Sequence, residues 1–275
     1  MRKEDRHKIT IITPSYNQAA YIGQTIESVL AQNYPDVEHI VVDGGSSDGT
    51  IDILKRYDHL IWIAEKDRGQ ADALNKGMAL ATGDIIGWIN SDDYYEKDVF
   101  GAVAHHFSDP STAWIVGNLS EIREDDGIII PRKSPKVTFE RLIRNPDIVR
   151  QQCTFFRQSA LDLAGGWNAE LFMVMDLDLW IRLARTSPPK MVDQTLAYFR
   201  VHANQKTGLS NLQRQTREIC RVLKREHAPW HAVAKLYFKK QLQALAGCCR
   251  TLLVLLGVRD AVRRCDPVRR RAGKP

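Results

Sequence analysis

The sequence predicts an α/β fold in which a mostly parallel central sheet is flanked by helices and followed by a C-terminal helical extension. Three observations predict this fold. Short apolar runs rich in β-branched residues alternate with segments of helical periodicity, polar or glycine-rich turns separate them, and 275 residues with 44% hydrophobic side chains can bury a core of ordinary size. In such sheets, ligands bind beyond the carboxyl ends of the strands.

The first half of the chain holds four strand patterns with helix patterns between them. Apolar residues at helical spacing, such as Ile22, Ile26 and Val29, indicate the first helix. The glycines and serines of residues 44–49 mark a turn and cap before the second helix. The expected strands are 8–13, 38–43, 60–64 and 85–89, and the expected helices are 19–32, 50–57 and 71–81.

The second half of the chain has a less regular pattern. We expect a polar hairpin centred on residues 124–127, and a short helix that Ser159 caps and Gly165-Gly166 ends. The other expected helices are 97–107, 176–184, 209–226 and 229–264, and the other expected strands are 113–116, 153–157 and 196–201.

Charge is distributed unevenly along the chain. Residues 1–227 hold 28 Lys and Arg against 31 Asp and Glu, a net charge of −3, whereas residues 228–275 hold 11 against 2, a net charge of +9; together they give the +6 of the whole chain. Affinity for a phosphate backbone needs positive charge over the working surface. The distribution therefore argues against nucleic acid as a partner of the body of the chain.

The basic tail has two interpretations. Within residues 229–264, apolar positions such as Leu245 and Leu252 lie opposite basic ones such as Lys239. Such a helix could bind an anionic membrane surface through residues 229–275, or it could pack on the rest of the protein with a solvated basic end. Arg250 and Gln243 interrupt the apolar stretch, which is too short for a membrane span.

The cysteines and the N-terminus indicate a compartment. The five cysteines show neither metal-ligand spacing nor a disulfide framework, which favours a reducing environment and argues against zinc. Residues 1–8 are charged and contain no apolar signal segment. We expect a cytoplasmic protein, peripheral on the inner face of the cell membrane if the tail binds lipid.

Two adjacent acids, Asp92 and Asp93, follow the apolar strand pattern 85–89. Neighbouring residues of an extended chain point to opposite sides, so one carboxylate can meet a divalent metal while the other reaches a hydroxyl or a water. The alternative is a cap for the helix that follows. Neither GxGxxG nor GxxxxGK[ST] occurs, so another device, such as a metal on these acids, must neutralise phosphates.

Other polar residues follow the remaining strands at the same edge of the expected sheet. Asp43 can accept hydrogen bonds from a base or a sugar, or it can hold the following bend as an Asx-turn. The loop of residues 13–17 offers hydroxyls, an aromatic ring and an amide, which suits a nucleoside but also suits helix capping. The segment from Asp67 to Asn75 ends at this edge too.

Two later segments add charged candidates. Because residues two apart lie on nearly opposite faces of a helix, only one of Asp176 and Asp178 can face a site. Asp178 has Arg182 as an i,i+4 ion-pair partner, so Asp176 is the better candidate for a general base. Arg200 and His202 share one face of a strand, and we assign Arg200 to a diphosphate and His202 to metal or phosphate, with a structural histidine as the alternative.

Taken together, the chain resembles the family 2 glycosyltransferases, which have the Rossmann-like GT-A fold. The resemblance covers about residues 8–202, and its motifs are specific in combination and order. They are Thr13-Pro14-Ser15-Tyr16-Asn17, Val41 to Thr50, Gly69-Gln70 to Asn75-Lys76-Gly77, Asn90-Ser91-Asp92-Asp93, Gln151 to Arg157, Gly165-Gly166-Trp167-Asn168 and Met175 to Trp180.

The resemblance implies a role for each site residue. Asp92 would meet the ribose or the donor sugar, and Asp93 would bind Mn²⁺ or Mg²⁺. Asp176 falls where the family places its base, although Met175 stands where the family often has Glu. The residues expected on the nucleotide side are Thr13, Pro14, Tyr16, Asn17, Asp43, Asn75 and Arg200.

The implied activity is transfer of a sugar from a UDP, GDP or dTDP donor to a saccharide or lipid-linked acceptor, in cell-surface polysaccharide or glycolipid synthesis. One displacement, with inversion, is the mechanism that the resemblance implies. The expected organisation is a GT-A catalytic domain, 1–208, with a nucleotide-sugar half, 8–118, and an acceptor half, 119–208, followed by a basic extension, 209–275.

Two other function classes fit parts of the pattern. A sugar nucleotidyltransferase would share the architecture, but it should carry a Gly-rich loop after its first strand, where this chain has the glycine-free residues 13–17. A non-catalytic saccharide-binding subunit would keep the fold and lose the base, and the presence of Asp176 argues against it.

Overall fold

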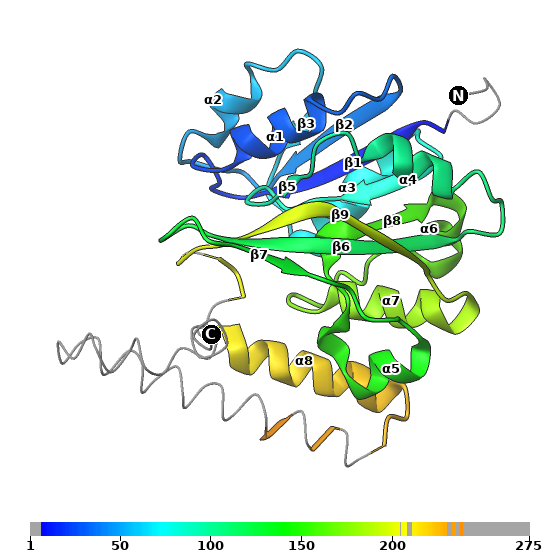
Figure 1. Ribbon diagram of the computed structural model, residues 1–275. Coiled ribbons are helices and arrows are strands. Elements are labelled where there is room, and N and C mark those ends of the chain that lie inside the picture. Colours follow the sequence, from blue (N-terminus) through cyan, green and yellow to red (C-terminus); the bar gives the residue numbers. More distant parts are fainter. Residues whose placement is uncertain (1–6, 204, 208–210, 230–232, 235–236, 239–275) are drawn as a thin grey trace, which may run out of the picture. The chain divides into compact units, whose positions relative to one another are not determined.

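The computed structural model describes residues 7–203, 205–207, 211–229, 233–234 and 237–238 (Figure 1). The chain divides into two units, Met1–Gln205 and Lys206–Pro275. The strands of the described part form one nine-stranded sheet in the order β3-β2-β1-β4-β8-β6-β9-β5, with β7 paired to β6. The α/β alternation predicted for the first half is confirmed.

Four parallel strands make up the N-terminal part of the sheet, with helices on both faces. Successive β2 side chains point to opposite faces, so Val41 packs with Ile22 and Leu54 of the first two helices, while Val42 packs with Ala73 of the third. Every residue of the first strand is buried. The elements are β1 (Ile9–Ser15), α1 (Ile22–Leu30), β2 (Val37–Asp43), α2 (Thr50–Leu54), β3 (Ile61–Ala64), α3 (Gln70–Leu80) and β4 (Ile85–Trp88).

The second half extends the sheet with longer strands than the sequence suggested. β6 (Trp114–Arg123) and β9 (Lys190–Val201) run parallel along their length (Figure 1), whereas we expected only 113–116 and 196–201. An added Cβ on Gly117 would lie 2.4 Å from the side chain of Leu196, so a glycine is needed where the two strands approach. The predicted hairpin turn after β6 is confirmed and leads into β7 (Ile129–Arg132).

The remaining elements cover and connect these strands. α6 (Gln158–Ala164) begins before Ser159, so the predicted serine cap is wrong, but Gly165 ends the helix with φ +79°, as expected. α5 was not expected. The other elements are β5 (Tyr94–Tyr95), α4 (Phe100–His106), α5 (Phe139–Arg144), η2 (Pro146–Ile148), η3 (Gln151–Cys153), β8 (Thr154–Arg157) and α7 (Met175–Thr186).

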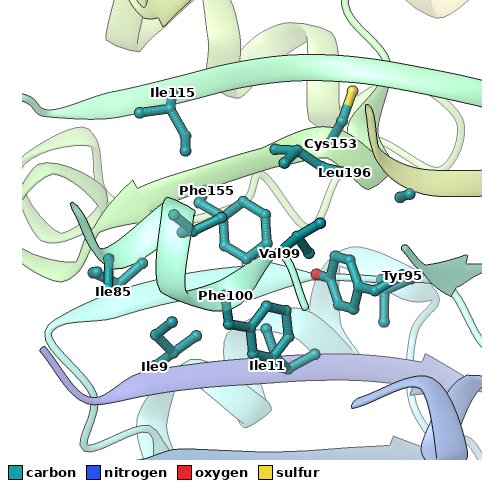
Figure 2. Packing of buried hydrophobic residues seen from close by; sticks show 14 of the residues in the cluster. Ile9, Ile11, Ile85, Tyr95, Val99, Phe100, Ile115, Cys153, Phe155 and Leu196 are labelled. Carbon is teal, nitrogen blue, oxygen red and sulfur yellow. The ribbon is translucent and has the colours of Figure 1, made fainter. Parts of the chain in front are cut away.

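The main apolar core joins the two halves of the sheet. Tyr95, Phe100 and Phe155 pack edge-to-face or stacked with centroids 5.1–6.0 Å apart. Figure 2 shows them between Ile11 of β1 and Leu196 of β9. Aromatic packing of this kind fixes the positions of the contributing elements. The core therefore holds β5, through Tyr95, against Leu196 and Ala197 of β9.

The second unit contributes one long helix to the described residues, α8 (Leu212–Arg225), within the helix predicted for 209–226. Most of the helix predicted for 229–264 lies outside the described residues. None of the helices in the described ranges has the length and apolar character that crossing a membrane requires. The functional roles assigned to 8–118, 119–208 and 209–275 stay predictions.

Candidate active site

The candidate site lies beyond the carboxyl ends of β1, β2 and β4, where residues 90–93 form a turn between β4 and β5. The amide of Asp93 donates to the carbonyl of Asn90 at 3.1 Å and closes this turn. The hydroxyl of Thr25, in α1, lies 2.9 Å from the carbonyl oxygen of Ser91 and 2.6 Å from that of Asp93. β5 then pairs with β9 and brings the end of β9 beside the turn.

Asp92, in this turn, forms a polar pair with His202. The Oδ2 atom of Asp92 lies 3.1 Å from Nε2 of His202, and the side chains are 18% and 1% exposed. The ring of Tyr21 lies 4.5 Å from the imidazole, between centroids. Nδ1 of His202 is buried and has no hydrogen-bond partner in the described part of the chain. The imidazole is thus held in place with one nitrogen directed at a carboxylate.

Asp93 lies inside the protein. Its side chain is fully buried, and its Oδ2 accepts hydrogen bonds from Gln152 at 2.7 Å and Asn90 at 3.4 Å, while its Oδ1 accepts one from the amide of Arg200 at 2.9 Å. Burial, followed by the neighbouring charge of Asp92, raises the pKa of Asp93 well above its ordinary value. The sequence prediction placed the metal on Asp93, but the structure exposes Asp92.

Arg200 is engaged by protein groups. Its Nε donates to the carbonyl of Asp92 at 2.9 Å, and its Nη2 donates to Oε1 of Gln24. The guanidinium carbon lies 5.1 Å from the ring centroid of Tyr21 and 5.5 Å from that of Tyr94. These contacts hold the side chain against α1 and β5, whereas the sequence prediction assigned it to a diphosphate.

Asp43 holds the bend after β2, which is the alternative that the sequence left open. It is fully buried; its Oδ1 accepts from the amides of Gly45 at 3.0 Å and Ser46 at 2.7 Å, and its Oδ2 accepts from the Ser46 hydroxyl at 2.7 Å. This is the Asx-type turn. Both oxygens are committed to the loop, so Asp43 shapes the site from within.

The loop after β1 presents two residues of the expected set, Tyr16 and Asn17, to solvent. Tyr16 is 62% exposed, whereas Thr13 and Pro14 are buried. The Thr13 hydroxyl lies 2.9 Å from Nε2 of the buried His39. Oδ1 of Asn17 accepts from the amide of Ser47 at 3.0 Å, which ties this loop to the next one.

Asn75, in α3, binds the backbone of the loop that follows α6, and its role on the nucleotide side stays a prediction. Its Nδ2 donates to the carbonyl of Trp167 at 2.7 Å, and its Oδ1 accepts from the amide of Trp167 at 3.0 Å. The ring of Trp167 in turn packs edge-to-face on Trp88, at the end of β4, with centroids 5.7 Å apart. Asn75 therefore fixes the loop that leads towards α7.

The N-terminus of α7 carries the candidate base. Asp178 pairs with Arg182 at 2.8 Å, as the i,i+4 spacing predicted. Asp176 is half-buried, and its Oδ1 accepts from the amide of Leu177 at 2.7 Å. An added Cβ on Gly69 would lie 3.3 Å from the ring of Phe172, so the segment before α7 passes beside the start of α3, at the same edge of the sheet.

Several residues of the site were not singled out from the sequence. Gln152 donates a hydrogen bond to Asp93, and the rings of Tyr21 and Tyr94 pack against the guanidinium of Arg200. Tyr94 could have been identified as a site residue from the sequence, because it directly follows Asp92 and Asp93. The role of Gln152 depends on a contact across 59 residues, which no local pattern reveals.

The donor set suits a divalent cation only if a ligand completes it. In the described ranges no group of three or more His, Cys, Asp and Glu side chains could hold a metal. Asp92 and His202, 3.1 Å apart, have about the separation of neighbouring ligands in an octahedral sphere with bonds of ~2.1 Å. A cation held by one or two protein groups takes its remaining ligands from phosphates and water.

Comparison with protein families gives one matching model. The model described as "Glycosyl transferase family 2" matches residues 10–163, which carry the loops after β1 and β2, the Asp92–Asp93 turn and Gln152.

Curated relatives match along most of the chain. The chain is 26% identical over 211 residues to a chondroitin synthase of Escherichia coli, covering 75% of the chain and 31% of that protein. It is 29% identical over 208 residues to a PGL/p-HBAD biosynthesis glycosyltransferase of Mycobacterium bovis, covering 74% of the chain and 78% of that protein. The chain thus spans about a third of the first relative and most of the second.

Solved structures share the fold. The mannosyltransferase PcManGT of Pyrobaculum calidifontis, in complex with GDP-Man and Mn²⁺, has a TM-score of 0.62 and 21% identity, covering 96% of the chain and 82% of that protein. TarS 1–349 of S. aureus, in complex with UDP-GlcNAc, has a TM-score of 0.63 and 19% identity, covering 78% and 66%.

Proposed function

The chain belongs to glycosyl transferase family 2 and has the GT-A fold, and on this premise we propose that it transfers a sugar from a nucleotide-sugar donor to an acceptor hydroxyl. The observation that carries the proposal is the Asp92–His202 pair. A carboxylate and an imidazole lie 3.1 Å apart beyond the carboxyl ends of the parallel strands, where such sheets bind nucleotides.

Asp92 and His202 are the residues that would hold Mn²⁺ or Mg²⁺. Asp93 is a weaker candidate, because its oxygens already accept three hydrogen bonds inside the protein. A bound divalent cation supplies positive charge that stabilises the departing diphosphate. The Mn²⁺ complex of PcManGT supports a divalent cation in this fold, without bearing on which residues hold it.

The nucleoside would lie over the loops after β1 and β2. Tyr16 offers an exposed aromatic face, and the Asp43 turn presents the backbone of Gly44 beside it. A side chain at position 44 would close this approach, because its Cβ would meet Asp67 and Tyr16. The complexes of related folds with UDP-GlcNAc and GDP-Man support UDP or GDP as the donor nucleotide, with dTDP as the third candidate.

Asp176 would act as the general base. Its carboxylate takes the proton of the acceptor hydroxyl while that oxygen bonds to the anomeric carbon and the bond from this carbon to the diphosphate oxygen breaks. The products are the glycoside, the nucleoside diphosphate and protonated Asp176. A single displacement inverts the anomeric centre. The position of Asp176 at a helix N-terminus favours its ionised form.

The acceptor is a saccharide or a lipid-linked molecule in the synthesis of surface polysaccharide or glycolipid. The names of the relatives, a chondroitin synthase and a PGL/p-HBAD biosynthesis enzyme, support this class. A cytoplasmic protein, peripheral on the membrane through 229–275, would meet such acceptors.

A binding panel tests the donor half of the proposal. Purified protein is melted with UDP, GDP or dTDP sugars, each with Mn²⁺ or with chelator. We expect one nucleotide to raise the melting temperature only with Mn²⁺. Asp92→Asn should remove this shift in melting temperature. Asp52→Asn, which changes an exposed acid paired with Lys55, should keep it. A full shift in Asp92→Asn would contradict the ligand assignment.

A transfer assay tests the base. Asp176→Asn should keep the Mn²⁺-dependent shift and lose transfer by at least ~100-fold, in the range typical of general-base removal. Unchanged transfer by Asp176→Asn would show that another group accepts the proton. Donor binding with no transfer by the wild type, across an acceptor panel, would favour the non-catalytic saccharide-binding alternative.

A further inference from the structure

We propose that Arg200 is a positioning residue that fixes the Asp92–Asp93 turn so that the Asp92 carboxylate stays beside His202. This inference rests on the proposed function, because the pair that Arg200 orders is the proposed cation site. It replaces the direct diphosphate contact expected for Arg200 from the sequence.

Arg200 binds the turn at both acidic residues. Its amide donates to Oδ1 of Asp93 at 2.9 Å, and its Nε donates to the backbone carbonyl of Asp92 at 2.9 Å. One residue of β9 thus holds the main chain of Asp92 and the side chain of Asp93. With both contacts in place, the Asp92 side chain is left to point towards His202, which lies two residues further along the same segment.

The guanidinium is itself held on the side of α1. Nη2 donates to Oε1 of Gln24, and the guanidinium carbon lies within cation–π distance of Tyr21 and Tyr94. Tyr21 also packs on His202, with centroids 4.5 Å apart. The same aromatic ring therefore contacts both the residue that orders Asp92 and the residue that pairs with it.

The shape of arginine is required for this arrangement. A planar guanidinium can lie over an aromatic ring while its edge donates hydrogen bonds in a fixed fork, whereas a lysine ammonium is a compact point charge on a flexible stem. If Arg200 only attracted a diphosphate, lysine could replace it and keep part of that attraction. If Arg200 holds Asp92 in position, lysine cannot replace it.

The experiment measures Mn²⁺ binding directly. Free Mn²⁺ is followed by electron paramagnetic resonance in the presence of the nucleoside diphosphate, UDP, GDP or dTDP, that stabilises the wild type most. We expect Arg200→Lys and Arg200→Gln to weaken Mn²⁺ binding by a similar factor of ten or more.

Arg157 provides the matched control. It lies at the opposite end of the sheet, in register with Ile85 at the start of β4, and its guanidinium donates to the carbonyl of Phe107 at 2.8 Å and lies 5.5 Å from the ring centroid of Phe107. Arg157→Lys should lower the melting temperature while leaving Mn²⁺ affinity unchanged. A loss of Mn²⁺ affinity in this variant equal to that in Arg200→Lys would overturn the inference, because the loss would then follow from general destabilisation.

Two further outcomes separate the inference from the function beneath it. If Arg200→Lys binds Mn²⁺ as tightly as the wild type while Arg200→Gln binds it more weakly, a positive charge at position 200 suffices. That result would overturn the positioning role but not the cation site. Wild-type protein that binds no Mn²⁺ with any of the three nucleotides would overturn the cation site and the inference together.

Discussion

Two buried carboxylates, Glu38 near the amino end of β2 and Asp93 beyond the carboxyl end of β4, have opposite electrostatic environments. Glu38 accepts hydrogen bonds from Lys8 at 2.8 Å, Thr10 at 2.7 Å and the Thr82 hydroxyl at 2.6 Å. Burial opposes its ionisation, but these bonds outweigh that effect and lower the pKa of Glu38 to about 2. Burial and the charge of Asp92 instead raise the pKa of Asp93.

The difference lies in the groups that surround each buried carboxylate. At the amino end, the ammonium of Lys8 neutralises the buried charge within the protein, so ionised Glu38 stabilises the fold. At the carboxyl end, the hydrogen bonds that Asp93 accepts come from the neutral amides of Gln152, Asn90 and the Arg200 backbone, and the charge of Asp92 disfavours its ionisation. A cation from outside would supply what Lys8 supplies to Glu38.

The largest expected effect comes from His39, the residue after Glu38 in β2. Burial, helped by the charge of His59, lowers the pKa of His39 from 6.5 to about 3, so the folded protein keeps it neutral. As the pH falls from 6.5 to 3, the unfolded chain gains a proton that the folded chain refuses. Stability present above pH 6.5 should fall by on the order of 4 kcal/mol over this window.

Denaturant unfolding of the wild type and of His39→Gln across this window measures the effect. Glutamine can keep a hydrogen bond to Thr13 without taking up a proton, so its stability should change less with pH. Equal pH slopes in the two proteins would contradict the expected role of His39.

Removing the compensated charge should be the next largest effect. Glu38→Gln leaves Lys8 without its ionic partner and should lower the free energy of unfolding by about 3 kcal/mol at pH 7. Because the lowered pKa of Glu38 gives stability that is present above pH 4.5 and lost towards pH 2, the variant should match the wild type more closely at pH 2. Urea titrations at both pH values measure this, and an equal deficit at both would count against it.

Removing a charge at the other end should have the opposite sign. Asp92→Asn keeps an oxygen for His202 and ends the repulsion between the two acids, so the free energy of unfolding without metal should rise by about 1 kcal/mol. Chemical denaturation in chelator measures it. A decrease in the free energy of unfolding as large as that of Glu38→Gln would mean that the acids at both ends of the sheet stabilise the fold.

The smallest effect is expected at an exposed ion pair. Lys55→Gln removes the partner of Asp52, and both side chains are more than half exposed. We expect no measurable change in stability or in nucleotide binding. A measurable loss of stability would mean that these exposed charges contribute as the buried ones do.

The parts of the fold that follow local rules were predictable from the sequence. Strand and helix periods with glycine turns located β1 to β4 and the helices between them, and the i,i+4 spacing identified the pair of Asp178 and Arg182. The full length of β6 and β9 was not predictable, because their pairing continues through polar residues and register shifts near Asn118. Strand pairing there is decided by distant partners.

The same limit applies to the site. The acidic turn was recognisable, but the choice of Asp92 over Asp93 as the exposed acid depends on Arg200 and His202, more than a hundred residues away. Asn75 matched a motif, yet its partner is the backbone of Trp167, 92 residues later. A residue type predicts the chemistry that a side chain can perform, whereas contacts far along the chain decide which side chains are free to perform it.

The hydrogen bond between Asp92 and His202 spans 110 residues of sequence, and this separation has a consequence for biosynthesis. At ~5–20 residues per second, a ribosome needs roughly 5–20 s between the two residues. During that time the acidic turn exists without β9, Arg200 or His202. The proposed cation site is therefore complete only after nearly the whole first unit has been made, so cation binding by nascent chains would report that β9 has joined the sheet.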